Sequence, residues 1–132
     1  MKKIVLTTMM ILGLVGCGST CPSEPPRYAQ YIEGGGYGMQ YHFKLYDVRG
    51  DAQHTPSLRC TQYTYVTSDV YSDKLGNVTA SDIVWTDMRG NEVFSINSDQ
   101  MNQMRMYLSK KKVVISGYTN EYAMENGTYP IQ

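Results

Sequence analysis

The sequence predicts an α+β fold, mostly antiparallel sheet with one amphipathic helix packed on a face of it. Three observations carry this prediction: segments in which apolar and polar residues alternate, a turn motif of the form Asp-x-x-Gly that recurs between them, and one stretch with helical spacing. Because such turns join neighbouring strands, we expect an antiparallel meander.

The first expected strand covers residues 39–46. Met39, Tyr41, Phe43 and Leu45 fall on one face of it, which is the period of a half-buried strand. The glycines at 34–36 precede it, and neither a helix signal nor a Gly-Lys-Ser/Thr sequence follows them. We therefore expect a flexible turn there and not a phosphate-binding loop.

The turn motif occurs three times. Asp47, Asp73 and Asp87 are each followed by glycine three residues later, at 50, 76 and 90. An aspartate in this position accepts backbone hydrogen bonds in a type I turn, and the glycine closes the hairpin in a left-handed conformation. The strands expected around these turns are residues 39–46, a long strand over 58–71 that bends, 78–86, and 92–96.

The expected helix runs over residues 99–110. Asn97 and Ser98 offer capping side chains before it, and Met101, Met104 and Leu108 fall on one stripe. The lysines at 110–112 would then lie at the negative end of the helix dipole, with contact to anionic lipid as the alternative use.

The last part of the chain returns to strands. Residues 113–116 are apolar and β-branched, and Asn126-Gly127 is typical of a two-residue hairpin between residues 122–124 and 128–131. Pro130 would restrict the final strand to a sheet edge.

The N-terminus has the form of a secretory signal. Lys2 and Lys3 precede a short apolar stretch over residues 4–15, too short to cross a bilayer. It ends in Leu14-Val15-Gly16-Cys17, which resembles the lipobox of bacterial lipoproteins. The resemblance implies cleavage before Cys17, a diacylglycerol on its sulfur and an acylated amine, which together anchor a chain stably.

The resemblance also implies a location. Gly18 stands where lipoproteins retained at the inner membrane usually carry aspartate, so the outer membrane of a Gram-negative envelope is favoured, facing the periplasm or the surface. The expected organisation is a signal peptide over 1–16, a lipidated, proline-rich tether over 17–27, and one small β-rich domain over 28–132.

Two further cysteines remain for the exported chain. In an oxidising compartment Cys21 and Cys60 are expected to form a structural disulfide, which in the chain-entropy model contributes about 3 to 4 kcal/mol. A redox pair usually has the spacing Cys-x-x-Cys, and a zinc site would need more ligands than His42 and His54 add. We expect no metal and no cofactor.

Charge argues against nucleic acid as a partner. Without Lys2 and Lys3, 10 of the 12 lysines and arginines remain against 12 acidic residues. Binding nucleic acid requires a clustered positive surface, and residues 110–112 form the sole basic run. We found neither a Gly-x-Ser-x-Gly elbow nor a His-Glu-x-x-His helix, so an enzyme is not the first expectation.

Tyrosine is the distinctive residue of the chain, with 12 copies. Tyr63, Tyr65 and Tyr71 should share one face of the long strand, and Tyr41 should project from its neighbour. Cross-strand packing is the first explanation, and a binding face is the functional one. We expect a non-enzymatic envelope lipoprotein that holds a protein or glycan partner. A small envelope hydrolase with an unrecognised site and a structural or surface-exclusion lipoprotein are the alternatives.

Overall fold

The computed structural model describes residues 25–48, 53–55, 60–96, 103–119 and 124–132. These residues divide into two compact units. The smaller unit holds two short strands, β5 (Gln53–Thr55) and β6 (Cys60–Gln62), which pair antiparallel with His54 opposite Thr61. Every other described strand belongs to the larger unit.

The larger unit contains two four-stranded sheets. The first has the order β3-β4-β7-β9, and the second has the order β12-β11-β10-β8. Neighbours within each sheet run antiparallel, so the predicted antiparallel sheet is confirmed. The strands are β3 (Arg27–Ile32), β4 (Tyr41–Val48), β7 (Tyr65–Ser72), β8 (Gly76–Thr79), β9 (Ile83–Thr86), β10 (Arg105–Leu108), β11 (Lys112–Ser116) and β12 (Gly127–Pro130).

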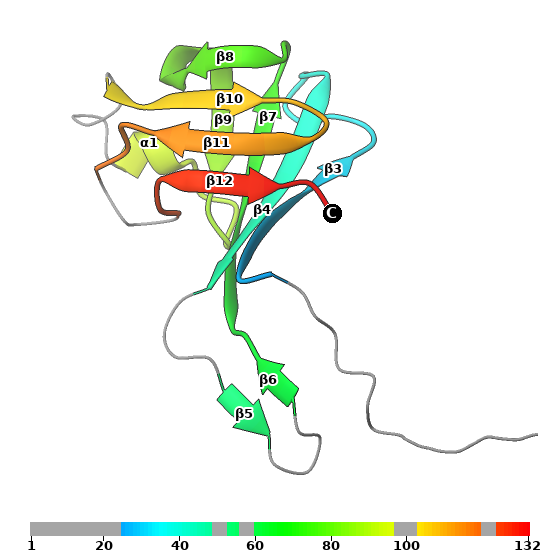
Figure 1. The fold of residues 1–132 in the computed structure, drawn as a ribbon. Helices are drawn as coiled ribbons and strands as arrows, with labels where there is room; N and C mark the ends of the chain where they lie inside the picture. Colours follow the sequence, from blue (N-terminus) through cyan, green and yellow to red (C-terminus); the bar gives the residue numbers. More distant parts are fainter. Residues whose placement is uncertain (1–24, 49–52, 56–59, 97–102, 120–123) are drawn as a thin grey trace, which may run out of the picture. The chain divides into compact units, whose positions relative to one another are not determined.

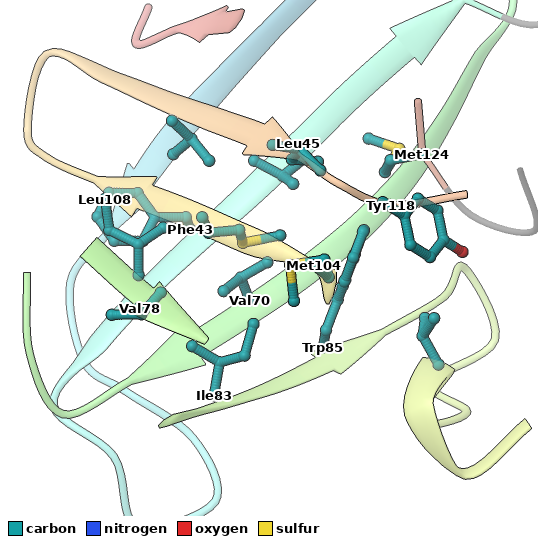
Figure 2. Packing of buried hydrophobic residues seen from close by; sticks show 14 of the residues in the cluster. Phe43, Leu45, Val70, Val78, Ile83, Trp85, Met104, Leu108, Tyr118 and Met124 are labelled. Carbon is teal, nitrogen blue, oxygen red and sulfur yellow. The ribbon is translucent and has the colours of Figure 1, made fainter. Parts of the chain in front are cut away.

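The core lies between the two sheets (Figure 2). Alternate residues of each strand enter it: Phe43 and Leu45 from β4 face Met106 and Leu108 from β10, and all four are at most 1 % exposed. Trp85 of β9 is also fully buried and contacts the Tyr118 ring at a centroid distance of 4.9 Å. Burial of one such side chain contributes about 1.5 to 3 kcal/mol, so this layer is the main source of stability.

The two sheets cross at a large angle and meet along one edge, where β12 lies beside β3 (Figure 1). Ala29 forms a parallel bridge with Ile131, and the Gln132 N–H donates to the Ala29 carbonyl at 2.9 Å. Because β12 is the edge strand of its own sheet, the restriction predicted from Pro130 is confirmed.

The predicted helix over residues 99–110 is wrong where the structure describes it. Residues 105–108 form β10, a central strand of the second sheet. Met104 and Leu108 fit a helical stripe and a strand equally well, but Met106 is 1 % exposed while Tyr107 is 39 % exposed. That alternation has a period of two. Residues 97–102, with the predicted cap, lie outside the described residues.

The described residues contain a 3-10 helix, η3 (Ala80–Asp82), and one short α-helix, which lies where a strand was predicted. Residues 92–96 were expected to form a strand, but Val93–Ile96 form α1, and Glu92 makes an isolated bridge with Thr86. Phe94 of α1 packs edge-on against Trp85 at a centroid distance of 5.7 Å. Burial of this aromatic pair explains why the strand is not continued.

The turn predicted at Asp87 is confirmed in detail. The Asp87 carboxylate accepts the backbone N–H groups of Arg89 and Asn91, both at 2.9 Å. The Gly90 N–H donates to the Asp87 carbonyl at 3.0 Å, and Gly90 has the left-handed φ of 82°.

The turn predicted at Asp73 does not close a hairpin, and residues 49–52 of the turn predicted at Asp47 lie outside the described residues. Asp73 to Gly76 connects β7 of the first sheet to β8 of the second, and the Ser72 hydroxyl accepts the Lys74 N–H there at 3.1 Å. Asp47 lies inside β4, is 2 % exposed and pairs with Arg27 of β3. The local sequence at Asp47 is typical of a turn, but burial of its carboxylate beside the partly exposed Arg27 decides its role.

The remaining strand predictions are partly right. The glycines at 34–36 lie in the turn between β3 and β4, and β11 covers the predicted strand at 113–116. The structure adds β3, which was not predicted, and separates residues 58–71 into β6 and β7. The single strand predicted over 78–86 is wrong, because η3 divides it into β8 of the second sheet and β9 of the first. Most of the strand predicted before Asn126 lies outside the described residues, so that hairpin stays a prediction. The Asn126 side chain accepts the Tyr118 N–H at 3.0 Å and donates to the Tyr118 carbonyl at 2.8 Å.

Several expectations concern residues outside the described part of the chain. The signal peptide, Cys17 and Cys21 all lie there, and of Cys60 the structure describes only its place in β6. Lipidation and the disulfide therefore remain predictions.

Candidate functional site

The outer side of the first sheet carries most of its aromatic and ionisable side chains. Since Phe43, Leu45 and Val70 point into the core, the residues between them on β4 and β7 point to the opposite side. We call this side the tyrosine face. It is formed by Tyr28 and Gln30 of β3, by His42, Lys44 and Tyr46 of β4, and by Tyr65, Asp69 and Tyr71 of β7.

Three tyrosines pack together at one end of the tyrosine face. Tyr28 lies directly opposite Tyr46, and their rings are stacked with centroids 4.4 Å apart and an interplanar angle of 5°. Tyr65 meets both rings edge-on, at 5.5 Å from Tyr28 and 6.0 Å from Tyr46. Tyr28 is 5 % exposed, whereas the other two rings are half-buried. The cluster therefore has a buried base and a partly open rim.

A second aromatic group lies at the other end. The His42 ring stacks on Tyr71 with centroids 4.4 Å apart, and Tyr37 from the preceding turn meets Tyr71 at 5.0 Å. The turn approaches so closely that a Cβ on Gly36 would lie 2.8 Å from the Tyr71 ring. Tyr37 is 62 % exposed and has a φ of 56°, a left-handed conformation that is uncommon outside glycine.

Polar side chains occupy the middle of the tyrosine face. His42 Nε2 lies 2.7 Å from the Asp69 carboxylate, and the Tyr46 hydroxyl donates to Gln30 Oε1 at 2.9 Å. Lys44 lies between Gln30 and Asp69 in the strand register. Hydrogen-bond donors and acceptors are thus placed between two aromatic groups.

The environment of Tyr71 favours its neutral form. Partial burial, the nearby negative charge of Asp69 and the neighbouring Tyr37 together raise the pKa of the Tyr71 phenol above its usual value. At neutral pH this side chain therefore presents a hydroxyl that both donates and accepts hydrogen bonds.

The structure distributes the four predicted tyrosines over different places. Tyr65 and Tyr71 lie on the tyrosine face. Tyr41 lies on the opposite side of β4, where it packs against the core beside Tyr31. Tyr63 belongs to the smaller unit, whose strands are described separately.

Sequence reasoning missed Tyr28, Tyr46, Tyr37 and the pairing of His42. Tyr28 follows a segment interpreted as a tether, so its strand was not expected. Tyr46 falls among the polar residues in the alternating pattern of the first predicted strand. A second tyrosine opposite it at such a position would have indicated an aromatic pair on the outer side of the sheet. No local signal connects His42 with Asp69, which is 27 residues further along the chain.

The same residues limit the chemistry of this face. Among the described residues, no group of three or more His, Cys, Asp or Glu side chains is arranged to hold a metal ion. The His42–Asp69 pair has the geometry of a base with its orienting carboxylate. Because Nε2 is engaged by Asp69, a nucleophilic catalyst would also require a hydroxyl or thiol at the other ring nitrogen, Nδ1.

Comparison with known proteins provides no family for this chain. It matches no protein-family model, no curated protein and no solved structure. Within the described ranges, no helix has the length and apolar character needed to cross a membrane. A functional proposal therefore depends on the geometry above and on the N-terminal sequence.

Proposed function

We propose that this chain is a lipid-anchored lipoprotein of the cell envelope whose β-rich domain binds a protein or glycan partner through the tyrosine face. The observation that carries the binding proposal is the cluster of Tyr28, Tyr46 and Tyr65 on the side of the sheet away from the core. The lipobox at residues 14–17 supports the anchor.

The packing of the tyrosine face supports binding because it limits the entropy lost on association. Tyr46 is held between a stacked and an edge-on ring, and its hydroxyl is bonded to Gln30. Immobilising a flexible side chain at an interface costs about 0.5 to 1.5 kcal/mol, and most of that cost is already met in the free domain. Tyrosine also combines a large apolar area with a polar tip, which suits a peptide or a sugar.

The conformation of Tyr37 supports the same location. A tyrosine at φ 56° is strained by about 1 kcal/mol or more, yet most of its ring lies in solvent. Such strain is commonly retained where a side chain is needed in one position, and this position lies beside Tyr71 and His42.

Photo-crosslinking in the native cell tests the tyrosine face. A photoreactive amino acid would replace Tyr46 or Tyr65 in the full chain, with the exposed turn residue Asn91 as the matched control. We expect an envelope-protein adduct from the two face positions and not from the control. Identical adducts from all three positions would refute the assignment of this face.

Retention on purified envelope glycan distinguishes the second class of partner. If the partner is a glycan, the wild-type chain should be retained and Tyr46→Ala should weaken retention more than Tyr46→Phe, because phenylalanine keeps the stacking surface. Equal retention of both variants and the wild type would exclude glycan binding by this cluster.

The anchor is tested separately from the partner. The wild-type chain should incorporate labelled fatty acid and fractionate with the outer membrane, and Cys17→Ser should lose both properties. Incorporation that survives Cys17→Ser would place the lipid elsewhere and remove the support drawn from the lipobox.

A hydrolase remains the second candidate because His42 and Asp69 are paired at 2.7 Å. If this pair were catalytic, His42→Gln would abolish turnover of envelope ester, peptide or glycan substrates by the wild-type chain. Binding to a partner with no turnover by either protein would favour the binding module.

A further inference from the structure

The polar side chains in the middle of the tyrosine face form one row across three strands. Gln30 of β3 lies opposite Lys44 of β4, and Lys44 lies opposite Asp69 of β7. All three point away from the core, because they alternate with buried residues of the same strands. We call Gln30, Lys44 and Asp69 the polar row.

Each member of the polar row keeps hydrogen-bonding capacity that the described contacts leave unused. The exposed Gln30 side chain gives its oxygen to the Tyr46 hydroxyl at 2.9 Å, so its two amide N–H groups remain as donors. One Asp69 oxygen lies 2.7 Å from His42 Nε2, and the second oxygen remains an acceptor. Within the described contacts Asp69 pairs with His42 and not with Lys44, which leaves the Lys44 ammonium as a further donor.

Aromatic rings flank the polar row on both sides along the strands. Tyr28 and Tyr46 occupy the next outward positions in one direction, and His42 and Tyr71 occupy them in the other. Since two residues advance a strand by about 6.7 Å, the two aromatic groups lie roughly 13 Å apart with the polar row midway. Tyr37, which is 62 % exposed, enlarges the second group.

Charge on this face favours a neutral ligand. Among the outward strand residues of the first sheet that the structure describes, Lys44 and Asp69 are the only Lys, Arg, Asp or Glu, and their charges are opposite. A strongly charged ligand would therefore meet a like charge beside each opposite one. Hydroxyl groups both donate and accept, so a hydroxyl-rich ligand can use the ammonium, the amide and the carboxylate together.

The strand order argues against recognition of an extended peptide here. β4 and β7 each have a hydrogen-bonded strand on both sides, so their backbone N–H and C=O groups are used within the sheet. A peptide that adds to a sheet does so through backbone groups at an edge. The tyrosine face instead presents rings and polar side chains.

We infer that the ligand of the tyrosine face is a neutral oligosaccharide that lies along β4, with sugar rings on the two aromatic groups and hydroxyls on the polar row. The C–H face of a sugar ring suits the apolar face of tyrosine, and its rim carries the hydroxyls. The inference rests on the proposed function and names its partner as glycan instead of protein. Because the two aromatic groups lie roughly 13 Å apart, more than one sugar unit is needed to reach both.

Calorimetric titration of the full chain, in a detergent without a sugar headgroup, tests this inference. The probes are glucose and N-acetylglucosamine, each as the monomer and as linear oligomers up to the hexamer. Lys44→Met tests the polar row, and its matched control is Lys111→Met, an exposed lysine between β10 and β11. Tyr37→Gly tests the exposed ring, and its melting temperature should change little because glycine adopts a φ of 56° freely. Circular dichroism melting shows that each variant is folded.

We expect an oligomer of one of these sugars to bind, and its monomer to bind at least about tenfold more weakly, because the monomer reaches one aromatic group. Lys44→Met should weaken binding of the oligomer about tenfold, the effect of losing a hydrogen bond to a charged group. Lys111→Met should change it by less than about twofold, and Tyr37→Gly should weaken it about fivefold.

Binding of none of the oligomers, equal affinity for monomer and oligomer, or equal effects of Lys44→Met and Lys111→Met would overturn the inference. A protein adduct at Tyr46 or Tyr65 without sugar binding would overturn it as well, but would leave the proposed binding function in place. Absence of both the adduct and sugar binding would remove the two proposals together.

Discussion

The pair formed by Arg27 and Asp47 offers the sharpest test of how the first sheet is held together. The two residues lie opposite each other on β3 and β4, and Arg27 Nε donates to Asp47 Oδ1 at 3.1 Å. The Asp47 side chain is 3 % exposed and that of Arg27 is 31 % exposed. The Tyr129 hydroxyl donates to the Glu125 carbonyl at 2.5 Å and lies 3.4 Å from the other Asp47 oxygen, which brings the second sheet to the pair.

The magnitude follows from this unequal burial. Removing one partner of a fully buried pair costs about 3 to 5 kcal/mol. Arg27 keeps a third of its side-chain surface in water and also donates to the Asn126 carbonyl at 3.0 Å, so it is only partly stranded when the carboxylate is lost. We therefore expect Asp47→Asn to lower the free energy of unfolding by about 2 kcal/mol.

Urea unfolding followed by Trp85 fluorescence measures this change, because Trp85 is the single tryptophan of the chain and is fully buried. Asp73→Asn, an exposed turn aspartate, is the control and should shift stability by less than about 0.5 kcal/mol. Arg27→Met, alone and combined with Asp47→Asn, completes a double-mutant cycle with an expected coupling of about 1 kcal/mol or more. Equal shifts for Asp47→Asn and the control, or additivity in the cycle, would refute the reasoning.

Three further predictions follow from the described contacts. Met106→Ala should lower the free energy of unfolding in urea by about 2 to 4 kcal/mol, because Met106 enters the core. Tyr107→Ala should lower it by less than about 1 kcal/mol, because Tyr107 points outward. Comparable losses would contradict the strand assignment of β10. The pKa of Tyr71 is raised in the folded state, so its contribution to stability is fully present below the usual tyrosine pKa of about 10. That contribution is lost as pH rises through the folded-state pKa. Tyr71→Phe should therefore flatten the alkaline decline of the urea midpoint. The Thr79 backbone N–H, with smaller contributions from the Thr79 hydroxyl and Lys74, lowers the pKa of Asp82. The contribution of ionised Asp82 to stability is therefore present above its unfolded-state pKa and is lost as pH falls through its folded-state pKa. Asp82→Asn should reduce the fall of the urea midpoint at acid pH, and an unchanged fall would contradict this.

The tyrosine face could be predicted only in part. The alternation of β7 is visible in the sequence, and it correctly placed Tyr65 and Tyr71 on one side of that strand. The facing of Tyr28 with Tyr46 depends on the register of β3 against β4. Register is set by turn geometry and by which face is buried, so a strand that is not recognised leaves its partners unknown.

Misplaced elements have a common cause. Residues 103–110 fit two periodicities over so short a segment, and Val93 and Phe94 are apolar residues that a strand or a helix accommodates equally well. The local preference for helix or strand was nearly balanced in both segments. Burial against the facing sheet decided between the alternatives, as it often does for short elements.

The sequence by itself determined the antiparallel β character, the turn at Asp87 and the strand β11, because each depends on neighbours within a few residues. It also supplied the basis for the anchor prediction at Cys17. Only the tertiary structure decided that Asp47 is a buried ion-pair partner, that His42 meets Asp69, and that the lysines at 110–112 close a β-hairpin beside Arg105 and Tyr107. These features join residues far apart in the chain, and their free energy comes from burial and from charges brought together by the packing of two sheets.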